Sequence, residues 1–120
     1  MPLITAWFRA FAFTLLIEQL AACWALRHEV PLGRRVALIA VANIASHPAV
    51  WLIFPELGAG LRWPRLVTLV VSEVWAFGLE ALIYSLLLGK GRARQAVWAS
   101  VLANGLSLSL GYVLRAFGLV

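Results

Sequence analysis

The sequence contains no aspartate, only one cysteine and few charged residues of any kind. Charged residues make up 12% of the chain, about half the share that is usual in soluble domains. With Cys23 as the single cysteine, an internal disulfide and a cysteine-based metal cluster are both excluded. The low charge also excludes an intrinsically disordered chain, because such chains are rich in charge and poor in apolar residues.

The sequence also lacks the short motifs of common catalytic sites. It has no Gly-rich phosphate loop, no H-E-x-x-H motif, no nucleophile elbow and no C-x-x-C pair. We therefore assign no catalytic residue. An intramembrane enzyme stays a minor alternative, in which a buried Glu would act as the base and His47 as the acid.

The net charge of +5 does not indicate a nucleic-acid partner. The basic residues stand singly or in pairs between apolar runs and form no patch interleaved with aromatic residues. This distribution is typical of residues that contact lipid headgroups and set membrane topology. We therefore expect the lipid bilayer as a partner and no nucleic acid.

Apolar residues dominate the composition of the chain. Hydrophobic residues make up 63% of the 120 residues, which is more than a soluble domain of this size can bury. Four runs are each long enough to cross a bilayer, which takes about 20 residues. The sequence predicts an all-α integral membrane protein with one domain, residues 1–120, folded as an antiparallel four-helix bundle. The expected spans are about 5–26, 36–54, 66–88 and 96–117.

The basic residues predict an orientation in the inner (plasma) membrane. Six of them lie in or beside the first and third connections, namely Arg27, Arg34, Arg35, Lys90, Arg92 and Arg94, and four lie toward the opposite side, namely Arg9, Arg62, Arg65 and Arg115. The bias predicts cytoplasmic first and third loops and termini on the outside. Aromatic residues near the first and third connections, Trp24, Tyr84 and Trp98, are expected in an interfacial belt.

The segment Leu20-Ala21-Ala22-Cys23 has the form of a bacterial lipoprotein cleavage box, which would remove the first span and place a lipid on Cys23. Glu18 and Gln19 interrupt the apolar run just before it. We therefore favour an intact first span over this weak motif match.

A short pattern, A-N-x-x-S, occurs at 42–46 and again at 103–107. Each copy follows a glutamate in the preceding span, Glu18 before Asn43 and Glu80 before Asn104, at nearly equal spacing. The pattern predicts two helical hairpins related by a pseudo-two-fold axis along the membrane normal. Coincidence in an apolar alphabet is the alternative.

Polar side chains are expected to share one layer inside the membrane. At the helical rise of about 1.5 Å per residue, Glu18, Asn43, Glu80 and Asn104 fall at similar depth. His47 and Ser107 come one turn higher, and Glu73 lies nearer the outer end of its span. Because no Lys or Arg lies at this depth, we expect the acids to bind a proton or a cation.

If the bound cation is a metal ion, the candidate ligands are Glu18, Glu80 and His47. Pro48, next to His47, leaves the carbonyl group of Ile44 without its helical donor. This carbonyl group is a candidate ligand or proton-relay element, and a simple kink is the alternative.

Two alternatives remain for the polar residues. Ser46, Ser107 and Gly111 are the expected helix-packing positions, and hydrogen-bonded Asn and Ser side chains can simply hold helices together. In that case the protein would be a structural or accessory subunit of a larger membrane complex. Translocation of the bound ion, by one chain or by a homo-oligomer, would follow if Glu73 and His47 connect the polar layer to solvent.

Overall fold

The structure, a computed structural model, describes residues 3–118, which are helical apart from short connections and contain no strand. The helices are α1 (Leu3–Ala25), α2 (Leu32–Pro48), the π-helical segment η1 (Ala49–Ile53), α3 (Phe54–Gly60), α4 (Arg65–Leu88) and α5 (Ala93–Ala116). The expected all-α class is confirmed for this range.

Four helical stretches are long and apolar enough to cross a membrane, as the sequence predicts. They are Ile4–Ala25, Leu32–Gly60, Arg65–Leu88 and Ala93–Ala116. The longest dimension of the molecule is 41 Å, against about 30 Å for the hydrocarbon core of a bilayer. Large apolar side chains such as Phe8, Val74 and Leu86 are more than 60% exposed, as expected for a surface that faces lipid.

The second stretch is longer than the sequence predicts, because α2, η1 and α3 continue one another from Leu32 to Gly60. We expected the span to end near residue 54, before Pro55. Pro48 has no N–H to donate, and the helix widens after it so that Phe54 N–H reaches back five residues to Ala49 O. Pro55 then lies in the first turn of α3, where a missing N–H costs little.

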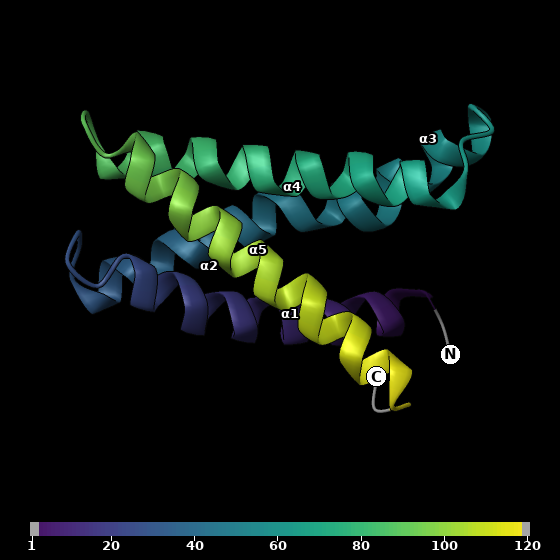
Figure 1. The fold of residues 1–120 in the computed structure, drawn as a ribbon, viewed down its shortest axis with the longest axis horizontal. Helices are drawn as coiled ribbons and strands as arrows, with labels where there is room; N and C mark the ends of the chain where they lie inside the picture. The colour runs from purple at the N-terminus through teal and green to yellow at the C-terminus, as the bar shows by residue number, and fades with distance from the viewer. Residues whose placement is uncertain (1–2, 119–120) are drawn as a thin grey trace.

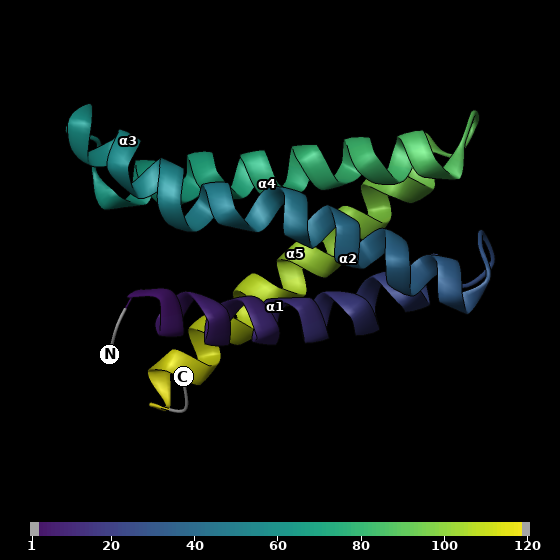
Figure 2. The same cartoon turned by 180° about the vertical axis from the view of Figure 1, so that it is seen from behind.

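Figures 1 and 2 show the α1–α2 and α4–α5 connections at one end of the molecule and α3 at the other. The main helix contacts form a ring, since α1 and α4 each pack against both α2 and α5. In both views α5 runs obliquely, from beside α4 toward the far end of α1. Every helix therefore contributes side chains to the space between them.

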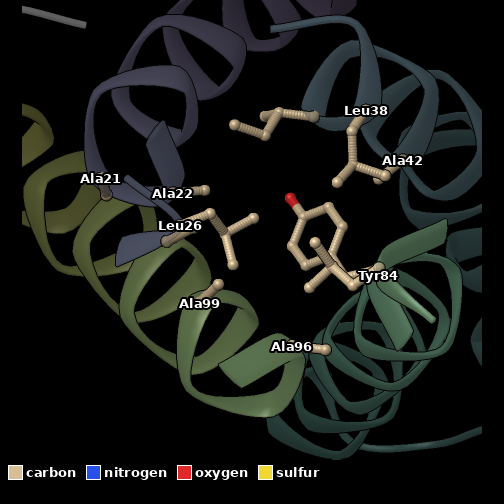
Figure 3. Packing of buried hydrophobic residues seen from close by; sticks show 11 residues of the cluster. Ala21, Ala22, Leu26, Leu38, Ala42, Tyr84, Ala96 and Ala99 are labelled. Atoms are coloured by element: carbon tan, nitrogen blue, oxygen red, sulfur yellow. The ribbon is translucent and has the colours of Figure 1, made fainter. Parts of the chain in front are cut away.

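The end with the two connections is closed by apolar packing, and we call it the apolar end (Figure 3). Its alanines let the helix backbones approach closely, and Leu26 and Ile39 are fully buried. Tyr84 is also fully buried here, so its ring packs between the helices and does not face lipid. The buried cluster comprises Ala21, Ala22, Leu26, Leu38, Ile39, Ala42, Tyr84, Leu88, Ala96, Ala99 and Ala103.

Arginine side chains tie the connections together at the apolar end. Arg35 Nη1 donates to Cys23 O at 2.6 Å, which satisfies a carbonyl group in the last turn of α1. Arg92 Nη1 donates to Glu29 O at 2.8 Å and lies 3.4 Å from the Glu29 carboxylate. Residues of the α4–α5 connection thus hold the α1–α2 connection in place.

Candidate functional site

A cavity of about 550 Å³ runs between the helices from the end opposite the apolar end. Arg65 and Arg115 lie at its mouth, at the start of α4 and near the end of α5. Glu18 and Glu80 lie at its floor, next to the apolar end, and each is only 1% exposed. We call these two glutamates the carboxyl pair.

Side chains from two other helices hold Glu80 in α4. Ser46 Oγ in α2 donates to Glu80 Oε1 at 2.8 Å, and Asn104 Nδ2 in α5 donates to Glu80 Oε2. Asn104 is itself held, because the same Nδ2 donates to Ser100 O at 3.0 Å. Both oxygens of Glu80 therefore accept hydrogen bonds, and the side chain has a fixed position.

Glu18 in α1 lies beside Glu80, close enough for the two carboxyl groups to interact. Ser107 Oγ donates to Glu18 Oε1 at 3.2 Å. Asn43 also lies beside the Glu18 carboxyl, but its Nδ2 donates to Ile39 O at 3.0 Å. Glu18 is thus held more loosely than Glu80.

Three buried polar atoms around the floor have no hydrogen-bond partner: Glu18 Oε2, Asn43 Oδ1 and His47 Nδ1. Buried polar groups are nearly always paired, and an unpaired one costs about 1–3 kcal/mol. Glu18 and His47 both line the cavity. The floor therefore has unused capacity to bind a proton, a water molecule or a ligand.

His47 and Glu73 lie on the cavity wall rather than in the carboxyl pair. The His47 ring is 8% exposed and packs edge-on against Phe11, with ring centroids 5.2 Å apart. Glu73 is half-buried. Within residues 3–118, no group of three His, Cys, Asp or Glu side chains could hold a metal ion, so Glu18, Glu80 and His47 do not form the metal site considered from the sequence.

No basic side chain accompanies the carboxyl pair. The ion pair found among the described residues joins Arg92 and Glu29, outside the cavity. Arg65 lies 15 residues from Glu80 along α4, an axial distance of about 22 Å. Two buried acids therefore face each other without a compensating cation from this chain in the described range.

The structure brings together most of the predicted polar residues: Glu18, Asn43, Ser46, Glu80, Asn104 and Ser107. Gly111 lines the cavity, and a Cβ atom there would meet nothing within 4 Å, so it is not a close helix contact. Tyr84 is fully buried below the pair, on the face of α4 that its spacing of four residues from Glu80 predicts.

Comparison with known proteins assigns the chain to no family. The chain matches no protein-family model, and neither a curated protein nor a solved structure matches it significantly. The function is therefore argued from the residues of the site.

Proposed function

We propose that this protein is an integral membrane protein of the inner membrane that binds a proton at the carboxyl pair. The four apolar helices would form an antiparallel bundle, with the apolar end toward the cytoplasm and the cavity open to the outside. The basic residues support this orientation, since six of the ten lie in or beside the two connections at the apolar end.

The observation that carries the proposal is the burial of two adjacent acids without a cation. Ionising both Glu18 and Glu80 would place two negative charges side by side in a medium of low polarity, which is strongly unfavourable. One proton held between them removes half of that charge. It also turns Glu18 Oε2, which has no partner, into a hydrogen-bond donor or acceptor toward Glu80.

In a variant of this proposal, the carboxyl pair binds a monovalent cation in place of the proton. Oxygen atoms of the carboxyl pair, Ser46 and Ser107 converge on the floor, and hard cations prefer oxygen ligands. Translocation of either ion would require the apolar end to open, because Tyr84, Leu26 and Ile39 are fully buried beneath the pair. In the observed arrangement the floor is reached from the cavity side.

We propose further that the chain contains an internal repeat of two helical hairpins. The hydrogen bonds of the site support this proposal. Each asparagine of the A-N-x-x-S pattern lies beside the glutamate of its own hairpin, Asn43 by Glu18 and Asn104 by Glu80. Each serine of the pattern bonds the other glutamate: Ser46 bonds Glu80, and Ser107 bonds Glu18. This reciprocal exchange is what a two-fold axis through the carboxyl pair would generate.

Infrared spectroscopy in deuterated buffer tests whether the carboxyl pair holds a proton. The wild-type protein in lipid should show the C=O stretching band of a protonated carboxylic acid at neutral pH, and the double variant E18Q/E80Q should lose it. Glu56→Gln is the matched control, because Glu56 is exposed in the first turn of α3. A band of equal size in E18Q/E80Q would contradict the proposal, and a band that disappears on adding sodium ions would favour the cation variant.

A scaffold role is the second candidate, since the polar contacts also join helices. Ser46 links α2 to α4, Asn104 links α5 to α4, and Ser107 links α5 to α1. A subunit of a larger membrane complex, or a homo-oligomer, would need such internal links. Gentle purification that yields a stable stoichiometric partner would support it, and an isolated monomer that retains the carboxylic-acid band would count against it.

A further inference from the structure

We propose that the cavity binds a zwitterionic organic ligand, with an ammonium group at the carboxyl pair and an acidic group at Arg65 and Arg115. The proposal rests on the proposed function, because it uses the negative charge that remains when the pair holds one proton. The proposal extends that function by naming the chemical class of a ligand for the same site.

The cavity has the size and lining of a small-molecule site. Its volume of about 550 Å³ falls within the range of about 300–1,000 Å³ for ligand pockets. Between floor and mouth the wall is largely apolar and includes Phe13, Trp51 and Leu69. Such a wall suits the carbon chain of a ligand whose polar groups lie at its two ends.

The floor suits an ammonium group. Glu18 lines the cavity, and its Oε2 accepts no hydrogen bond from the protein. When the pair shares one proton, this oxygen atom still has a lone pair for an N–H donor. With one shared proton the carboxyl pair carries a single negative charge, which one ammonium ion would neutralise. His47 is 8% exposed, and its unpartnered Nδ1 offers a second acceptor on the same wall when the ring is neutral and this nitrogen carries no proton.

The mouth suits an acidic group. Arg65 and Arg115 are exposed and line the cavity. Among the described residues, neither forms an ion pair with Glu73 or with the carboxyl pair. A ligand with only a positive charge would be repelled at this mouth, whereas an acidic group would be attracted to it.

The spacing along α4 sets the length of the ligand. Arg65 and Glu80 are separated by about 22 Å along the helix axis. The Glu80 side chain tilts toward the N-terminus of α4 and so toward the mouth, and the proposal requires the Arg65 side chain to fold into the cavity when a ligand binds. The ligand would then bridge a gap on the order of 10 Å, about the length of an extended chain of eight carbon atoms. Glu73 lies on the wall within this gap, so the middle of the cavity also favours the positive half of the ligand.

Isothermal titration in lipid nanodiscs, with empty nanodiscs subtracted, tests the proposal with three probes of one chain length. The probes are 8-aminooctanoate, octylamine and octanoate. We expect 8-aminooctanoate to bind at least about tenfold more tightly than either of the others, because only it pairs both charges. Equal affinity of octylamine would show that the mouth contributes nothing, and equal affinity of octanoate would show that the floor contributes nothing. Either result would overturn the proposal.

Variants of the mouth and of the floor test which charged group of the ligand each of them binds. R65Q/R115Q should reduce the affinity for 8-aminooctanoate to that for octylamine, and E18Q/E80Q, which removes both acids of the floor, should reduce it to that for octanoate. Arg62→Gln is the control, since Arg62 is exposed and does not line the cavity. If no probe binds while the carboxylic-acid band depends on Glu18 and Glu80, the ligand proposal fails and the proton proposal stands. If the band is absent, the proton proposal fails whatever the probes do.

Discussion

The apolar end and the cavity end are built from the same four helices, yet they are held together in different ways. At the apolar end, Ala96, Ala99 and Ala103 of α5 are fully buried against neighbouring helices, and Arg35 and Arg92 fasten the connections. At the cavity end the helices enclose open space, and hydrogen bonds from Ser46, Asn104 and Ser107 cross it at the floor.

This difference separates stability from binding. Close packing spreads its free energy over many contacts, so its loss is felt by the whole fold. The floor depends on a few polar groups, some of which are left unpaired in the structure. Changes at the apolar end should therefore lower the free energy of unfolding, and changes at the floor should mainly alter proton or ligand binding.

The largest effect should follow from enlarging the buried alanines of the apolar end. Ala99 and Ala103 are both fully buried, and overpacking costs about 1–3 kcal/mol per site. The double variant A99L/A103L should lose most of its cooperative thermal unfolding, followed by circular dichroism in micelles.

The matched control is Ala93→Leu, the same substitution at an exposed position at the start of α5. It should unfold at the wild-type temperature. If A99L/A103L also unfolds at the wild-type temperature, the helices at the apolar end are not closely packed and the contrast between the two ends disappears.

The two acids of the floor should respond differently to the same change. Glu80→Gln places an amide N–H₂ against Ser46 or Asn104, both of which donate to Glu80, and should cost about 1–2 kcal/mol of unfolding free energy. Glu18→Gln should cost less, because its Nε2 can occupy the place of the unpartnered Oε2 and donate to Glu80.

Denaturant titration of both variants in micelles compares the two free energies of unfolding. Glu56→Gln, at an exposed position in α3, should match the wild type. A larger loss for Glu18→Gln than for Glu80→Gln would mean that Glu18 is the better-held acid, contrary to the hydrogen bonds described above.

Much of the fold follows from the sequence, because runs of apolar residues and the breaks between them fix the four spans. The shared depth of Glu18 and Glu80 could also be predicted, since helical rise converts residue number into depth. The continuation of the helix past Pro55 could not, because it depends on a local widening of the hydrogen-bond pattern after Pro48. The burial of Tyr84 follows from its place four residues after Glu80 on the same helix face, whereas the interfacial preference of tyrosine is only an average tendency and gives no facing.

A smaller effect is expected where α3 meets α4 at the rim of the cavity. A Cβ atom on Gly58 would collide with the side chain of Thr68, whereas one on Gly60 would meet nothing within 4 Å. Gly58→Ala should therefore destabilise by about 1–2 kcal/mol, and Gly60→Ala should be neutral or stabilise by up to about 1 kcal/mol, since alanine favours the helix. Thermal unfolding of the two variants makes the comparison, and Thr68→Ala should restore the stability of Gly58→Ala. Equal effects of the two glycine substitutions would show that α3 does not pack on α4.

The smallest effect should come from the Tyr84 hydroxyl group, a polar group inside the apolar end. It is fully buried and has no hydrogen-bond partner, so Tyr84→Phe removes an unpaired polar group without removing the ring. We expect no loss of stability, and a gain of up to about 1 kcal/mol, because an unsatisfied buried hydroxyl is itself costly. Ser46→Ala is the matched change at the floor: it also removes one hydroxyl group, but one that donates to Glu80, and should cost about 1 kcal/mol. Denaturant titration of both variants distinguishes the two ends. A loss on Tyr84→Phe equal to that on Ser46→Ala would mean that the Tyr84 hydroxyl is bonded, through water or through the carboxyl pair, and that the polar floor extends into the apolar end.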